Sequence, residues 1–207
     1  MSRCQPLTFA PVTLAVVLAG LPAAAQTCPT DVGDLAQGIV VTYEDGATST
    51  FGPGEQPGTL SEIYREAGGV TYRNVLGQGL HLLNLSEIGP DGQYVPDTGF
   101  AYVYDAPLPA AVEPLQGWSV PYHTQGAGGE WVGTYSGNAG PEVEIVIGDC
   151  RYPGLEVTLM QKDGDFSSMF QIDYLPGLGI GVLRAWGEPF GEVTRLTPVS
   201  IMLKEQL

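Results

Sequence analysis

The chain has 207 residues, of which 23 are acidic and 8 are basic, and its formal net charge at pH 7 is −15. This charge repels nucleic-acid phosphates and anionic lipid headgroups, so neither is an expected partner. It also keeps an exported protein soluble, which accounts for it without any binding role.

The first residues have the layout of a targeting segment. Arg3 supplies a positive end, residues 11–21 are mostly apolar, and residues 23–25 are alanines. This layout predicts a secretory signal peptide cleaved after Ala25, with export to the periplasm or the cell exterior. The apolar stretch is shorter than the ~20 residues of a membrane-spanning helix, and no second run of that length follows, so we expect no membrane span. Residues 26–207 then form a single β-rich domain of ordinary size.

Two cysteines, Cys28 and Cys150, follow the predicted signal peptide. In an oxidising compartment an isolated pair is most simply a disulfide, which would join the leader to the turn after residues 142–148. A reactive thiol or a metal-binding pair are the alternatives. Neither cysteine has a nearby histidine or a Cys-x-x-Cys partner, so the sequence favours the disulfide.

The first half of the domain reads as short strands between turns. Ile39, Val41 and Tyr43 alternate with other residues, which is the period of a half-buried strand. Residues 59–67 are ambiguous: Thr59 and Glu62 have capping-box spacing for a two-turn helix, but the same residues also alternate. Because its neighbours are strands, we interpret this segment as a strand. The next strand, residues 80–88, is apolar on both faces and contains His81, on whose face we expect Leu83 and Leu85.

The second half continues the same pattern. Residues 155–159 alternate, and the turn at Asp163–Gly164 is a strong hairpin signal because both residue types tolerate positive φ. Residues 166–174 and 180–186 follow as two further strands. The sequence thus predicts an all-β fold with little helix, an antiparallel meander of about 10–12 short strands. That count suits a curved sheet, a half-barrel or a barrel.

No set of residues carries an obvious catalytic chemistry. A nucleophilic mechanism needs a base, and the two histidines are His81, expected to be buried in its strand, and His123, beside a Gly-rich loop. Two distant histidines and an oxidised cysteine pair are poor zinc ligands, so we expect no metal and no other cofactor. The glycines of residues 177–181 follow Pro176 and lead into a strand, so they do not form a dinucleotide-binding loop.

Aromatic residues are plentiful for a small β domain, and most belong in its core. If the sheet curls without closing tightly, some would line a concave apolar cavity suited to a lipid or another hydrophobic ligand. The candidates for these ligand-lining positions are Tyr102, Tyr104, Trp118, Trp131 and Trp186.

An exported antiparallel domain without a catalytic motif resembles the curved-sheet periplasmic carriers of the lipoprotein-localisation type. The segment from Tyr174 to Arg184 also resembles a strand-turn-strand segment of uncharacterised exported bacterial proteins. The carriers have helices that cover the sheet, whereas this chain shows no clear helix. The resemblance implies a hydrophobic ligand but transfers no functional residue.

We therefore expect an exported β-sheet binding or interaction protein, whose partner is a hydrophobic small molecule or another envelope protein. One alternative is a glycan hydrolase of the cell envelope that uses paired carboxylates, since 23 acids form many pairs. Another is a structural module with no small-molecule site. The sequence does not define an oligomeric state.

Overall fold

The computed structural model describes residues 27–126 and 129–206. The predicted signal peptide, residues 1–25, lies outside the described residues. Within them the chain forms one antiparallel sheet and two short 3-10 helices, η1 (Val32–Ala36) and η2 (Lys204–Gln206). The strands are β1 (Ile39–Tyr43), β2 (Thr48–Pro53), β3 (Thr59–Arg65), β4 (Thr71–Gly77), β5 (His81–Ile88), β6 (Phe100–Tyr104), β7 (Gly117–Gly126), β8 (Val132–Ile147), β9 (Cys150–Asp163), β10 (Phe166–Leu175), β11 (Ile180–Gly187), β12 (Val193–Arg195) and β13 (Pro198–Leu203).

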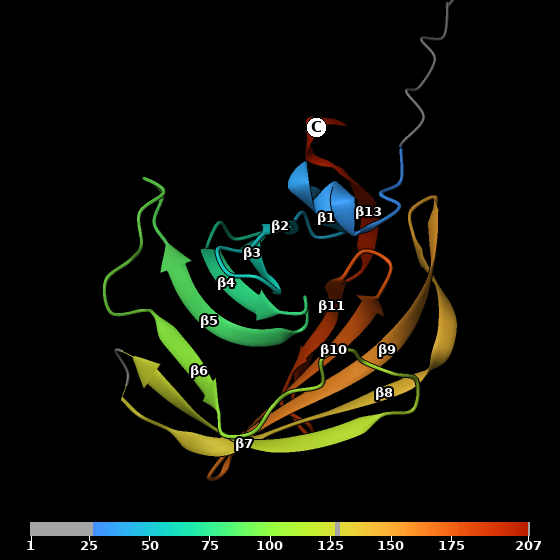
Figure 1. The fold of residues 1–207 in the computed structure, drawn as a ribbon. Helices are drawn as coiled ribbons and strands as arrows, with labels where there is room; N and C mark the ends of the chain where they lie inside the picture. Colours follow the sequence, from blue (N-terminus) through green and yellow to red (C-terminus); the bar gives the residue numbers. More distant parts are fainter. Residues whose placement is uncertain (1–26, 127–128, 207) are drawn as a thin grey trace, which may run out of the picture.

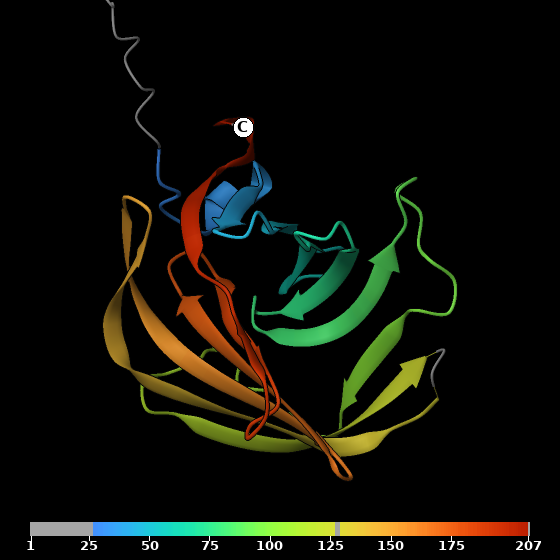
Figure 2. The same ribbon diagram turned by 180° about the vertical axis from the view of Figure 1, so that it is seen from behind.

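Each strand from β1 to β12 pairs with its neighbours in sequence, so the sheet is a meander. The exception is β13, which pairs antiparallel with β1, so that β12 and β13 form the two edges of the sheet. Figures 1 and 2 show that the sheet curls strongly, and that β13 lies next to β1 near η1. The hydrogen-bonded order does not close, so the sheet is not a barrel.

The predicted fold class is confirmed, with 13 strands in the described residues instead of 10–12. Most of the ambiguous segment at residues 59–67 is a strand, β3, which pairs with β4 over its whole length and with β2 over residues 60–65. The Asp163–Gly164 turn joins β9 to β10, and Gly164 has the positive φ of 59° that this tight connection requires. Local turn chemistry therefore determines the hairpins here.

Two cores lie within the curl, and the long strands β8 and β9 contribute to both. The first core includes Ile39 and Phe51 from β1 and β2 together with Ile147 at the end of β8. The second core includes Tyr135 from β8 and Leu159 from β9. A register shift between Ala139 and Glu142 interrupts the β8–β9 pairing, and such a bulge bends a strand enough to serve two packing regions.

The predicted disulfide is confirmed: Cys28 and Cys150 are bonded across a sequence separation of 122 residues, with their Cα atoms 5.7 Å apart. Cys150 is buried at the start of β9 within the first core. The bond thus attaches the segment before η1 to the β8–β9 turn. None of the helices in the described residues is long and apolar enough to span a bilayer.

Candidate functional site

A cavity of about 210 Å³ lies on the concave side of the sheet, between the β3–β6 region and the β8–β11 region. Its apolar wall consists mainly of leucine side chains from both regions. These are Leu76, Leu80, Leu82, Leu85, Leu159 and Leu183. Tyr102 and Phe170 contribute aromatic surface to the same wall. The lining therefore resembles that of small-molecule sites, which are mostly apolar with a few polar groups.

A β-bulge sets which side chains of β5 reach this cavity. Asn74 on β4 pairs with Leu85, but Leu76 pairs with Leu82, so one residue of β5 is extra. Strict alternation would place Leu82 and Leu85 on opposite faces, whereas the bulge brings both to the cavity. The expectation that Leu85 shares the face of His81 is therefore wrong, because period-two alternation breaks at the bulge.

The turn between β4 and β5 closes one side of the cavity by packing against the turn between β10 and β11. The Gly181 amide donates a hydrogen bond of 2.8 Å to the Gly79 carbonyl. A Cβ atom on Gly79 would lie only 1.9 Å from the carbonyl oxygen of Gly179, and Gly79 also has a φ of +71°. Both the backbone conformation and the close approach thus require glycine at position 79.

The cavity also contains a carboxylate, that of Glu62 on β3. The Ser49 hydroxyl donates to one carboxylate oxygen at 2.7 Å, and the Asn74 side-chain amide donates to the other at 2.9 Å. Glu62 is partly buried, and its accessible side faces the cavity. Burial raises the pKa of Glu62 above its ordinary value, while the two hydrogen bonds act in the opposite direction.

The β3–β4 register explains why an acid points inward here. Leu60, Glu62 and Tyr64 share one face of β3, and they pair with Leu76, Asn74 and Tyr72 of β4. Leu60 and Tyr64 pack against the first core. Glu62 therefore occupies the one polar position on an otherwise apolar face, flanked by the amide of Asn74 on the next strand.

The five ligand-lining candidates take different places in the structure. Tyr102 lines the cavity, and Tyr104 lies beside it, donating a hydrogen bond of 2.8 Å to the Leu82 carbonyl. Trp118 makes an edge contact with His81. Trp131 packs on Phe100 but is 44% exposed, and Trp186 is 43% exposed.

Of the five, Tyr102 belongs to the cavity lining, and the structure places Tyr104, Trp118, Trp131 and Trp186 outside it. A ligand role for any of the five stays a prediction. Sequence reasoning missed Glu62 and Asn74. The signal that could have found Glu62 was its position between Leu60 and Tyr64 at period two, where a polar side chain is unusual on an inward face.

His81 is buried, as its strand suggested. Tyr135 lies within hydrogen-bond distance of Nδ1 at 3.0 Å, and Trp118 covers the ring edge-on. Burial lowers the pKa of His81 to about 4, so the imidazole is neutral at physiological pH. It lies at the start of β5, beside the β4–β5 turn, and is not among the residues that line the cavity.

No family model, curated protein or solved structure matches this chain. Its function therefore has to be argued from the geometry alone.

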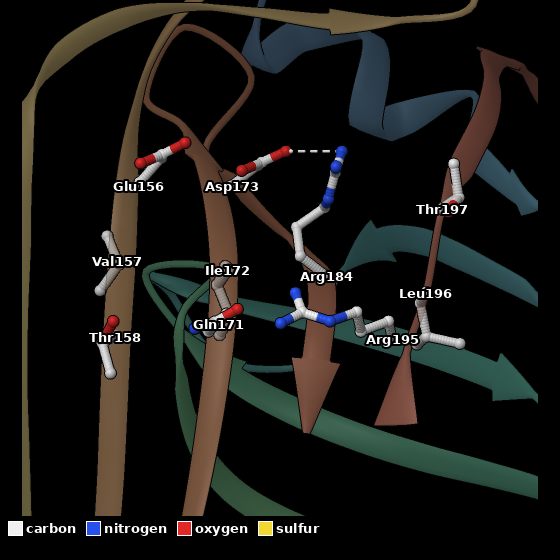
Figure 3. A pocket seen from close by; sticks show the side chains of 10 residues that line it. All are labelled: Glu156, Val157, Thr158, Gln171, Ile172, Asp173, Arg184, Arg195, Leu196 and Thr197. Atoms are coloured by element: carbon white, nitrogen blue, oxygen red, sulfur yellow. Dashed lines mark hydrogen bonds and ion pairs between the residues drawn. The ribbon is translucent and has the colours of Figure 1, made fainter. Parts of the chain in front are cut away.

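A second concavity, of about 290 Å³, lies on the outer side of β9–β12 and is lined mainly by polar groups. Glu156 and Asp173 are direct partners on β9 and β10. Figure 3 shows the Arg184 guanidinium next to the Asp173 carboxylate, and Arg195 pointing from β12 toward β10. The Arg184–Asp173 ion pair measures 3.2 Å. Burial raises the pKa of Asp173, Arg184 counteracts this, and Glu156 adds to it.

Metal binding finds no support in the described ranges. Among residues 27–126 and 129–206 there is no group of three or more His, Cys, Asp or Glu side chains placed to hold an ion. The expectation of no metal and no cofactor stays a prediction.

Proposed function

We propose that this chain is an exported binding protein that holds a small apolar ligand in the cavity between β3–β6 and β8–β11. The observation that supports this proposal most directly is the leucine-lined cavity, which lies beside the two hydrophobic cores. A ligand that fills this cavity and binds only the folded state would stabilise the fold.

The size of the space restricts the ligand. An apolar cavity of ~150 Å³ in another protein takes up benzene, so about 210 Å³ suits a ring-sized or branched aliphatic molecule. A full-length lipid chain is too large for it. The predicted signal peptide and the Cys28–Cys150 disulfide support an extracytoplasmic location for this binding.

Thermal unfolding in the presence of ethylbenzene tests the proposal. We expect Tm to rise by about 5–10 °C at a ligand concentration of 100 times Kd, because the ligand binds only the folded state. Leu85→Trp, which fills the cavity from β5, should abolish this rise. Val199→Trp on β13, where the native side chain is 43% exposed, is the matched control and should keep it. The same Tm with and without ethylbenzene in the wild-type protein would contradict the proposal.

The second candidate function is the envelope glycan hydrolase, and the Glu156–Asp173 pair favours it. A carboxyl group whose pKa burial raises, as at Asp173, can serve as a general acid beside a second carboxylate. Arg184, however, engages Asp173 directly, which supports a structural ion pair instead. A screen of envelope glycans should show no hydrolysis; activity that Asp173→Asn and Glu156→Gln each abolish would establish the hydrolase.

A further inference from the structure

Glu62 is a partly buried carboxylate without a cationic partner among the described residues. The ion pairs of arginine in this part of the chain join Arg73 to Glu55, Arg151 to Glu144 and Arg184 to Asp173. None of them involves Glu62. Transferring a carboxylate out of water is costly unless a cation or enough donors compensate it. Two neutral donors, the Ser49 hydroxyl and the Asn74 amide, provide only part of that compensation.

A second polar atom beside Glu62 also lacks a partner. The side-chain carbonyl oxygen of Asn74 is buried without a hydrogen bond in the described structure. Because the Asn74 amide group already donates to Glu62, its carbonyl oxygen remains as an acceptor on the same residue. Glu62 and Asn74 both line the cavity. The Glu62 carboxylate is the charged acceptor at this end of the cavity, and an occupant with a hydrogen-bond donor would satisfy it further.

We infer that the cavity selects a small apolar amine, whose ammonium group binds the Glu62 carboxylate while its hydrocarbon part lies against the leucines. This inference rests on the proposed function, because it names the ligand class of the same cavity. An ammonium group carries three donors and no acceptor, which suits a carboxylate. It also supplies the positive charge that Glu62 lacks, and the net charge of −15 attracts cations to the protein.

Isothermal titration calorimetry with four probes of similar size tests the ligand class. The probes are 2-phenylethylamine, 2-phenylethanol, ethylbenzene and 3-phenylpropionate. We expect the amine to bind about ten- to hundredfold more tightly than the alcohol, which is the difference that a charge-assisted hydrogen bond makes. The carboxylate should not bind, because Glu62 repels it.

The variant Glu62→Gln keeps the size of the side chain and removes its charge. It should lower the affinity for the amine to that for the alcohol. Glu142→Gln, at an exposed position on β8, is the matched control and should preserve the preference for the amine. Circular dichroism of both variants checks that the sheet is intact.

The outcomes separate this inference from the function on which it rests. Binding of all the uncharged probes without a preference for the amine would overturn the amine inference and leave the apolar binding function in place. Equal loss of amine affinity in Glu62→Gln and Glu142→Gln would overturn it as well, since that result reflects general attraction to an acidic surface. If no probe binds, the proposed function and the inference both fail.

Discussion

The imidazole of His81 lies between Trp118 and Tyr135, with only 1% of the residue exposed. The neutral imidazole packs there at little cost, whereas the imidazolium would lose the water that solvates its charge. The folded protein therefore binds a proton on His81 only weakly. The unfolded chain has no such restriction and takes up the proton near the ordinary pKa of 6.5. The difference couples folding to pH at a single residue.

We predict that His81 lowers stability in acid. Its pKa in the folded state is about 4, below the unfolded value of 6.5, so its contribution is full above pH 6.5 and is lost as pH falls toward 4. The loss amounts to about 3 kcal/mol. Urea unfolding of the wild type and His81→Gln at pH 7 and pH 4 measures it. The difference between the two proteins should change by this amount; a constant difference would show that His81 does not titrate between these limits.

Glu62 shows how far residue-level sequence reasoning reaches. The inward face of β3 could be read from the alternation of Leu60, Glu62 and Tyr64, but the spacing of Thr59 and Glu62 equally fits a helix cap. Only the pairing with β2 and β4 resolves the ambiguity, because it brings Ser49 and Asn74 to the carboxylate. A single sequence cannot supply that pairing.

At the scale of the elements, the sequence predicts the hairpins, but it does not predict the bulges. Asp163–Gly164 determines the β9–β10 turn through local backbone chemistry, so the sequence predicts it. The bulge in β5 depends on how β4 and β5 fit the curvature of the sheet, and no residue type marks it. That bulge moves Leu85 from the expected face to the cavity, so the leucines of the lining were not predictable from the alternation.

The contact between the β4–β5 and β10–β11 turns gives a prediction for Gly79→Ala. The added Cβ would collide with the Gly179 carbonyl oxygen, and φ at this position is +71°. We expect a loss of about 3 kcal/mol or more in the free energy of unfolding, combining the collision with the strain of positive φ.

Gly92→Ala is the matched control for this contact. Gly92 has a similar φ of +78°, but no atom lies within 4 Å of a Cβ atom built there. It should therefore lose only about 1 kcal/mol, the effect of the backbone strain. Urea denaturation measures both variants, and equal losses would show that the two turns do not form a specific contact.

For the whole molecule, the disulfide limits how far the unfolded chain can expand. Cys28 and Cys150 close a loop of 122 residues, which corresponds to about 4–5 kcal/mol in the chain-entropy model. We predict that replacing both cysteines with alanine lowers the free energy of unfolding by up to this amount and leaves the β-sheet circular dichroism spectrum unchanged. Guanidinium unfolding followed by circular dichroism provides the measurement. An unchanged midpoint would mean that the bond adds no stability.

The overall architecture was predictable because it is a sum of local hairpins, and a meander needs no long crossover connections. The pairing of β13 with β1 and the division of the interior into two cores were not, since both depend on how far the whole sheet curls. The cavity is a consequence of that curl. It arises where the β4–β5 hairpin meets β10 and β11, far apart in the sequence.

The central claim is that this cavity is a ligand site, and intermolecular nuclear Overhauser effects test it most directly. In protein with ¹³C-labelled leucine methyl groups and added ethylbenzene, we predict contacts from the ligand ring to the methyl groups of Leu76, Leu82 and Leu85, which line the cavity. Contacts only to the exposed Leu115, or no contacts at all, would contradict the account.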